Sequence, residues 1–245
     1  MKREYQLPSL TVSSDYTVAD QMRMAKAARY FAWQSDMAKA ALGRRVLEIG
    51  CGLGNFTEQL RDRECVVGLD VDPACIAHHQ QRFAGAGHIR SFAMDALDPA
   101  LLELRRERLD SVACLNVLEH IEDDLGLLRR MHELLPAGGR VVLLVPAFMA
   151  LYGEIDRNLG HYRRYTRASM AATAAQANLR VRQMRFMNTV GFFGWWVNAK
   201  ILRKTEQSEG QIALFDGVVV PVMSRLEGLV PPPFGQSLFV VLEKA

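Results

Sequence analysis

The sequence lacks the cysteine and histidine patterns that mark disulfide-rich and zinc-binding proteins. Its four cysteines, Cys51, Cys65, Cys75 and Cys114, form no C-x-x-C pair, and its six histidines have no zinc-like spacing. All four cysteines stand in or beside apolar segments, which indicates reduced, buried thiols rather than a disulfide framework. We therefore expect a cytoplasmic protein that holds no metal.

Membrane and nucleic-acid signals are also absent. No run of about 18 uncharged apolar residues appears, and the opening MKREYQLPSL has no apolar signal-peptide core. Lys and Arg number 30 against 27 Asp and Glu, so the net charge is only +3. We expect no stable membrane anchor and no nucleic-acid partner. The 245 residues, of which 49% are apolar, suffice for a single domain over residues 1–245.

The chain alternates short apolar runs with amphipathic segments. A helix is expected over residues 18–42, and further helices from Asn55, from Asp72-Pro73 and around residues 127–135. The expected strands between them are RRVLEIG, CVVGLDV, HIRSFAM, SVACLN and RVVLLVP. Near-continuous apolar strands separated by helices predict a parallel sheet covered on both faces.

After Pro146 the pattern changes. A polar loop over residues 152–166 precedes an expected helix at 167–177 and a strand at 179–187. The aromatic stretch GFFGWW follows, and the chain ends in the apolar run SLFVVLEK, which predicts a last strand. We divide the domain into an N-terminal helical cap (1–42), a core (43–187), a cap insertion (188–235) and the last strand (236–245).

A glycine-rich loop directly after the first strand is the strongest functional signal. Gly50, Gly52 and Gly54 let the backbone turn tightly and approach a ligand closely. Their G-x-G-x-G spacing differs from the G-x-G-x-x-G of nicotinamide enzymes, which argues against a nicotinamide oxidoreductase. Asp70 and Asp95 follow the next two strands, so all three features belong to one edge of the sheet, where ribose hydroxyls and an exocyclic amine can find acceptors.

The sequence resembles class I S-adenosylmethionine-dependent methyltransferases of the small-molecule type. The matching blocks are EIGCGLGN at 48–55, Asp70 in GLDVDP, Asp95 in AMDAL, and NVLEH at 116–120, within about residues 41–147. The resemblance implies a Rossmann-like, doubly wound α/β fold. Its seven-stranded sheet is mostly parallel with an antiparallel last strand, and helices cover both faces.

The same resemblance implies how S-adenosyl-L-methionine binds. It places the methionine part at Glu48, Gly50 and Asn116, the ribose at Asp70, and adenine beside Val71, Met94 and Asp95. The positions assigned to the cofactor are Glu48, Gly50, Cys51, Gly52, Gly54, Asp70, Val71, Met94, Asp95, Ala96, Asn116 and Val117.

The methyl acceptor decides what else the site needs. The cofactor already carries the electrophile, so a carboxylate acceptor needs no base, whereas a hydroxyl does. His161, in the loop after the fifth strand, and His120, after the fourth, are candidate bases, and Tyr152 is a third catalytic candidate. The alternative roles are structural, with His161 fixing the loop and His120 positioning the cofactor or capping a helix.

Two further groups are candidate substrate contacts. Arg163 and Arg164, followed by Tyr165, can bind an acidic group; the alternative is a solvated loop or pairing with Asp156. Trp195 and Trp196 can cover an apolar substrate, and the alternative is core packing.

These observations favour methyl transfer to oxygen, as a carboxylate or hydroxyl, on a small, partly apolar molecule that can carry an acidic group. Transfer to carbon or nitrogen stays open, as does a non-methylating cyclase or activator subunit that binds the cofactor. The segment after the fourth strand lacks the Pro-Pro-aromatic motif of adenine methyltransferases, and the chain has no Pro-Cys pair. A monomer or homodimer is expected.

Overall fold

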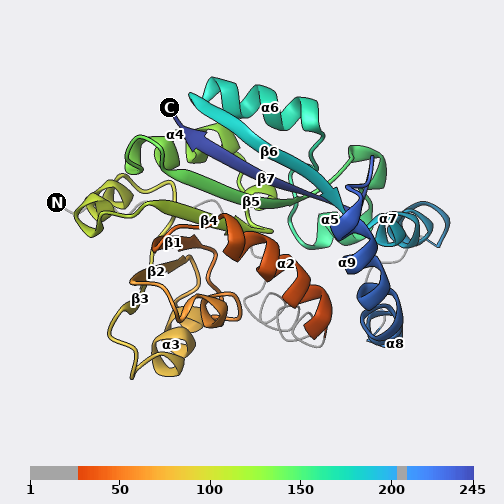
Figure 1. Cartoon of the computed structure of the whole chain (residues 1–245), viewed down its shortest axis with the longest axis horizontal. Helices are drawn as coiled ribbons and strands as arrows, with labels where there is room; N and C mark the ends of the chain where they lie inside the picture. Colours follow the sequence, from red (N-terminus) through yellow and green to blue (C-terminus); the bar gives the residue numbers. More distant parts are fainter. Residues whose placement is uncertain (1–26, 203–208) are drawn as a thin grey trace.

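A mixed seven-stranded sheet organises the part of the chain that the computed structural model describes, residues 27–202 and 209–245 (Figure 1). The strand order is β3-β2-β1-β4-β5-β7-β6. Strands β1 to β5 are parallel, and β7 runs antiparallel to β5 and β6, which confirms the expected topology. The strands are β1 (Arg45–Ile49), β2 (Cys65–Asp70), β3 (Ile89–Ala93), β4 (Ser111–Leu115), β5 (Arg140–Pro146), β6 (Leu179–Met187) and β7 (Ser237–Lys244).

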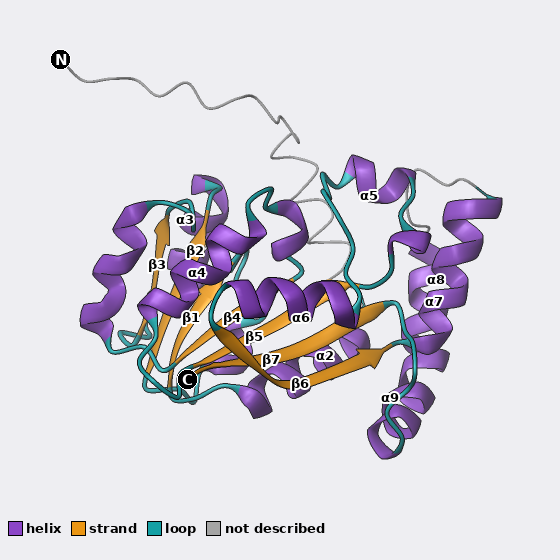
Figure 2. Ribbon diagram, turned by 90° about the horizontal axis from the view of Figure 1, so that it is seen from above, coloured by secondary structure: helices purple, strands orange, loops and turns teal. Residues whose placement is uncertain are grey.

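Side chains that alternate along the strands feed two separate cores. Leu47 and Ile49 of β1 belong to the core under α4 (Asp124–Leu134) and α6 (Arg167–Gln176), and the intervening residues face the other side. Val46 of β1 and the residues of the neighbouring strands that face the same side pack with α2 (Ala28–Ala41) and the end of α3 (Pro73–Arg82). Figure 2 shows α2 and α6 on opposite faces. Helices therefore cover both faces, as predicted.

Local hydrogen bonds explain where the helices start. The Asp72 carboxylate accepts from the Ala74 amide at 2.8 Å, with Pro73 in the first turn of α3. Asp123 caps α4 in the same way through the Gly126 amide at 2.8 Å. The expected helix start at Asp72-Pro73 is confirmed, and the helix expected around residues 127–135 begins at Asp124 and ends at Leu134.

Two segments differ from the sequence-based expectation. The helix expected from Asn55 is a single 3₁₀ turn, η1 (Thr57–Leu60). Only Phe56 and Leu60 anchor it to the core, and the following Arg-Asp-Arg-Glu run offers no apolar side chain for a second turn. The helix expected over residues 18–42 starts at Ala28 in the described part of the chain, and residues 18–26 lie outside it.

Other short helices lie in the connections. They are η2 (Pro99–Glu107), η3 (Leu118–His120), η4 (Met149–Leu151) and α5 (Glu154–Asn158). The last of these lies inside the segment expected to be a polar loop, where the Gly153 amide donates to the Asp156 carboxylate at 2.9 Å.

A helical arm, defined as residues 189–202 and 209–230, stands at one end of the sheet (Figure 2). It consists of α7 (Thr189–Trp196), η5 (Val197–Ile201), α8 (Glu209–Leu214), η6 (Phe215–Val219) and α9 (Val220–Leu229). The arm is attached to α2 through Asp216, whose carboxylate accepts the amides of Arg29 and Tyr30 at 3.2 and 2.8 Å. Within the described ranges, no helix combines the length and apolar character needed to cross a membrane.

Candidate functional site

The glycine-rich turn after β1 forms one side of the site. Gly50, Gly52 and Gly54 all have positive φ, at 76°, 49° and 82°. A Cβ atom on Gly50 would stand 2.3 Å from Cγ2 of Val117, so the segment after β4 packs directly against the turn. The turn therefore requires glycine for both conformation and space.

Residues on either side of this contact are among those assigned to the cofactor, and Gly50 and Asn116 are assigned to its methionine part. Asn116 has a left-handed backbone, φ 54°, which its amide fixes by donating to the Leu144 carbonyl at 2.8 Å. Cys51 is buried, and its amide donates to the Leu69 carbonyl at 2.9 Å. The tertiary structure thus brings Gly50, Cys51, Asn116 and Val117 to one place.

Glu48 lies beneath the turn with only 4% of its surface exposed. Burial raises the pKa of this carboxyl to about 8, with the nearby Asp70 adding to the effect and a hydrogen bond from Thr57 opposing it. The Thr57 hydroxyl donates to Glu48 Oε2 at 2.6 Å and lies 2.9 Å from Nε2 of His79, which can donate to that hydroxyl. Burial lowers the pKa of His79 to about 4, so this imidazole is neutral at neutral pH.

Asp70 ends β2 with its carboxylate facing the turn. Its two oxygens accept from the Gly52 and Asp72 amides at 2.9 and 3.0 Å, and each keeps a lone pair for a ribose hydroxyl. The pKa of Asp70 is raised by burial despite these bonds. The next side chain, Val71, is 70% exposed, an uncovered apolar group that an adenine ring would cover. This edge therefore fits a nucleoside.

The remaining nucleoside candidates follow β3. The Met94 amide donates to the Asp70 carbonyl at 2.9 Å, which ties the two strand ends together. Met94 is half-buried and Ala96 is buried. Asp95 is exposed, and one of its oxygens accepts the Leu97 amide at 2.8 Å. Asp95 shapes this turn and leaves its second oxygen open to solvent.

A buried histidine–carboxylate pair lies in the loop after β5. His161 Nδ1 is 2.9 Å from Oδ1 of Asp156, a fully buried carboxylate that also accepts from Arg164 Nε at 2.8 Å. Burial alone would raise the pKa of Asp156, but the bonds from His161 and Arg164 outweigh it and hold that pKa below its ordinary value. An ionised Asp156 keeps the proton of His161 on Nδ1 and leaves Nε2 as the acceptor.

Two residues from the β4 connection meet His161 and complete what we term the acceptor-side cluster, Glu119, His120 and His161. One nitrogen or oxygen atom of each lies within 4.8 Å of the others, and the two imidazole rings are 4.6 Å apart. Burial raises the pKa of Glu119 to about 7, and its Oε2 atom has no hydrogen-bond partner within the described part of the chain. Burial also lowers the pKa of His120 to about 4, so it is neutral at neutral pH.

The cluster can act chemically in two ways. Imidazole nitrogens beside a carboxyl group whose pKa burial raises to about 7 can accept and pass protons. Two imidazoles and one carboxylate are also a donor set that divalent metals accept. The sequence-based expectation named both histidines. It missed Glu119 and the pairing of Asp156 with His161, and the only available signal was the adjacency of Glu119 to His120.

Several candidate substrate and catalytic side chains have partners inside the protein. Tyr152 donates its hydroxyl to the His161 carbonyl at 2.6 Å, which fixes the loop backbone. Arg164 is 4% exposed and pairs with Asp156, and Tyr165 donates to the Asp124 carboxylate at 2.9 Å. Arg163 pairs with the same Asp124 at 2.8 Å and is partly exposed. Of the two arginines, Arg163 is the one open to solvent.

The tryptophans of α7 differ in environment. Trp195 lies under the Arg164 guanidinium, with the ring centroid 4.9 Å away, and its buried Nε1 atom has no partner among the described residues. Trp196 is 43% exposed. Trp195 therefore packs behind the loop after β5 that carries His161, which we call the acceptor loop. Trp196 lies on the outer surface of the arm.

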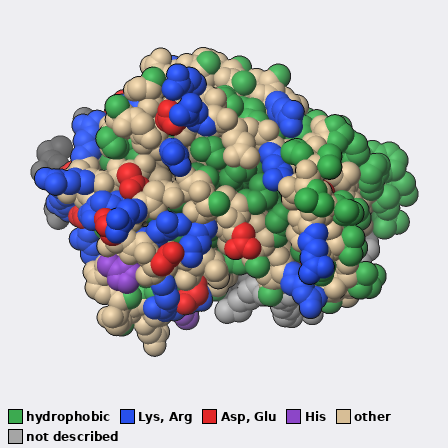
Figure 3. Space-filling view, in the orientation of Figure 1, with side chains coloured by type: hydrophobic (Ala, Val, Ile, Leu, Met, Phe, Trp, Pro, Cys, Tyr) green, Lys and Arg blue, Asp and Glu red, His purple; other side chains and the backbone are tan. Residues whose placement is uncertain are grey.

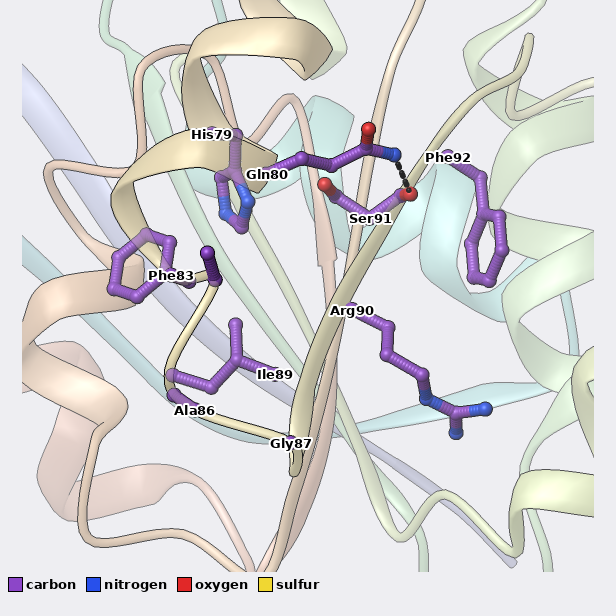
Figure 4. A pocket seen from close by; sticks show the side chains of 10 residues that line it. His79, Gln80, Phe83, Ala86, Gly87, Ile89, Arg90, Ser91 and Phe92 are labelled. Carbon is purple, nitrogen blue, oxygen red and sulfur yellow. Dashed lines mark hydrogen bonds between the residues drawn. The ribbon is translucent and has the colours of Figure 1, made fainter.

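A separate hollow lies between α3 and the edge strand β3 (Figure 4). Gln80 spans it by donating to the Ser91 carbonyl at 2.9 Å. None of the predicted site residues lines it, and its link to the glycine turn is His79.

Comparison with known proteins identifies the family of the chain. A family model described as a methyltransferase domain matches residues 21–184. Ubiquinone biosynthesis O-methyltransferase of Pseudomonas aeruginosa (strain LESB58) is 33% identical over 115 residues, 45% of this chain and 47% of that protein. The enzyme of the same name from Pseudomonas syringae pv. tomato is 32% identical over 110 residues, 44% and 47% of the two chains. The chain thus spans about half the length of the curated relatives it matches.

Solved structures share the fold over nearly the whole chain. A chain from the complex of the Haloferax volcanii Trm112 methyltransferase activator with the putative methyltransferase superposes with a TM-score of 0.64 at 16% identity, covering 96% of this chain and 99% of that one. Geranyl diphosphate C-methyltransferase from Streptomyces coelicolor A3(2), with S-adenosyl-L-homocysteine, gives 0.63 at 15% identity, covering 96% and 87%. At such identities the likeness shows the fold alone.

Proposed function

Because the chain belongs to the class I S-adenosylmethionine-dependent methyltransferases, we propose that it methylates a hydroxyl oxygen on a small, partly apolar molecule. The observation that carries this proposal is the His161–Asp156 pair at the acceptor-side cluster. A hydroxyl must lose its proton during transfer, and this pair presents an imidazole nitrogen oriented to take it. The name of the curated relatives, an O-methyltransferase, supports the same acceptor atom.

The residues around the glycine turn hold the cofactor in this proposal. Asp70 accepts the ribose hydroxyls, Val71 and Met94 lie against adenine, and Gly50 and Asn116 receive the methionine part. Bound S-adenosylmethionine supplies a methyl group on a positively charged sulfur, which is already a strong electrophile. The ionised form of Glu48, 4% exposed below the turn, is favoured when a cation binds above it.

On the acceptor side, His161 Nε2 would accept the hydroxyl proton as the methyl–oxygen bond forms and the methyl–sulfur bond breaks, which leaves the sulfur as a neutral thioether. Asp156 stabilises the imidazolium that results, because it already accepts the Nδ1 proton. His120, with its pKa of about 4, stays neutral and does not repel that charge. Glu119, with its pKa of about 7, can take the proton on from the imidazolium before the next turnover.

The test is a methyl-transfer assay on a panel of hydroxylated aromatic compounds, carboxylic acids and amines. Release of S-adenosylhomocysteine is measured for the wild type and for His161→Asn. We expect turnover with hydroxyl compounds, and a loss of about 10² to 10⁴-fold in kcat in the variant at unchanged cofactor affinity.

Other outcomes separate the alternatives. Turnover of carboxylic acids that survives His161→Asn would favour a carboxylate acceptor, which needs no base. Turnover of amines alone, or a product whose new methyl lies on carbon, would exclude oxygen as the acceptor. Tight cofactor binding with no S-adenosylhomocysteine release from any compound would favour a non-methylating role.

A further inference from the structure

The helical arm carries an unusual number of exposed apolar side chains. Among the described residues, 17 large hydrophobic side chains are exposed, and 12 of these belong to the arm or its end at Val230. Within the arm, the most exposed are Leu229 at 82%, Val230 at 71%, Leu214 at 66%, Val218 at 61% and Ile201 at 60%. Patches of this kind on soluble folds mark an interaction surface.

The exposed residues form stripes rather than a scatter. Leu214, Val218, Val222 and Leu226 follow one another at four-residue steps from the end of α8 through η6 and α9, so they share one helix face. Phe193, Val197 and Ile201 repeat the same spacing along α7 and η5. Such a face normally packs on a core, but here it meets solvent. Figure 3 shows hydrophobic side chains gathered at the end of the molecule where Figure 1 places α7.

Among the arm residues whose side chains the structure describes, the charges are sorted by sign. The acids in that set, Asp216 and Glu227, are 7% and 3% exposed, and both are buried against the rest of the protein. Glu227 accepts the amides at the start of α7, from Asn188 and Thr189, at 2.9 Å each.

In the same set of described side chains, the exposed charged residues are Lys200 and Arg225, both cationic. Apolar stripes accompanied by cations fit an anionic lipid surface, where the stripes enter the interface and the cations meet headgroups.

The arm also contacts the acceptor loop. Lys200 Nζ donates to the Tyr152 carbonyl at 2.8 Å, and Ala199 leaves no room for a side chain at Gly153. Trp195 packs under Arg164, the partner of Asp156. A surface that docks on the arm is therefore next to the loop that carries His161.

We propose that the helical arm docks on the surface of an anionic bilayer, so that the site takes its acceptor from molecules dissolved in that bilayer. The docking of the arm is inferred from its exposed apolar stripes, and from the burial of its described acids beside exposed cations. The statement about the acceptor rests on the proposed function, and it assigns the substrate to lipid-soluble hydroxyl compounds.

The docking experiment uses the full chain without cofactor or acceptor, floated with vesicles of phosphatidylcholine with and without phosphatidylglycerol. We expect the wild type to float with the anionic vesicles and its tryptophan emission to shift to the blue, because Trp196 is 43% exposed in water. Leu226→Glu should weaken vesicle binding by about tenfold or more. Val181→Glu is the matched control, since it adds the same charge at a 38% exposed valine on β6, outside the arm, and should bind as the wild type does.

Three results would overturn the docking proposal. One is a wild type that stays unbound with both kinds of vesicle. Another is equal loss in Leu226→Glu and Val181→Glu, with both variants showing the wild-type unfolding transition. The third is a wild-type dimer that Leu226→Glu dissociates, which would make the stripes a contact between two copies.

Other results test the proposed function and the source of the acceptor independently of docking. A chain that binds anionic vesicles but methylates no hydroxyl compound keeps the docking and refutes the transfer to oxygen. Methylation of water-soluble hydroxyl compounds at the same rate with and without vesicles refutes the bilayer source of the acceptor.

Discussion

The protonation of Glu48 should make the stability of this protein fall as the pH rises. In the folded chain its pKa is about 8, because burial removes the carboxylate from water, whereas an ordinary glutamate titrates near 4.5. Between these values the folded protein holds a proton that the unfolded chain has released. The contribution of Glu48 to stability is therefore fully present below about pH 4.5 and is lost as the pH rises to about 8.

The size of this effect follows from the two pKa values. A difference of one pKa unit corresponds to about 1.4 kcal/mol, so the interval from 4.5 to about 8 corresponds to about 5 kcal/mol at alkaline pH. Glu48→Gln keeps the volume and an oxygen that can accept from Thr57, but it does not titrate. The free energy of unfolding of this variant relative to the wild type should therefore rise by a few kcal/mol between pH 5 and pH 9.

The measurement is urea unfolding of both proteins across that pH range. Other buried groups with shifted pKa values, such as His79 and His120, are present in both proteins and cancel in the difference. Glu103→Gln, at an exposed position of η2, is the control and should follow the wild type at every pH. A constant difference between Glu48→Gln and the wild type would mean that Glu48 is ionised throughout, and the argument from burial would be wrong.

Three further predictions concern the site. Asp70→Asn should weaken S-adenosylmethionine binding by about 1–3 kcal/mol in titration calorimetry, and an unchanged affinity would show that this acid does not contact the ribose. Gly50→Ala should lower the melting temperature and reduce cofactor binding, because φ is 76° and the added Cβ meets Val117 at 2.3 Å; wild-type behaviour in both assays would contradict the geometry of the turn. Treatment with EDTA should leave turnover unchanged if His161 acts as a base. If EDTA stops turnover and Mn²⁺ restores it, the acceptor-side cluster is a set of metal ligands.

The strands and the cofactor edge could be predicted from the sequence because their signals are local. The apolar run bounded by turn residues predicts β2 independently of the segments that pack on it. Asp72-Pro73 starts α3 through a hydrogen bond between residues two positions apart. The three glycines predict a tight turn because their backbone freedom belongs to the residue itself. Local signals are weaker at Asn55, where the expected helix shrinks to one turn for lack of apolar side chains to anchor it.

The arrangement of residues on the acceptor side could not be predicted from the sequence, because it depends on the tertiary structure. His120 and His161 are 41 positions apart, and only the meeting of the β4 and β5 connections brings their rings within 4.6 Å. The sequence marked Arg164 as a candidate substrate contact, but the fold buries it against Asp156, where the pair excludes water. Periodicity likewise shows that the arm has an apolar face but not whether that face is covered. The residues themselves therefore determined the strands, the turn and its acids, because those follow from backbone preference and spacing. The tertiary structure alone decided which charges pair, which histidines meet and which apolar face stays exposed, because these depend on contacts between segments distant along the chain.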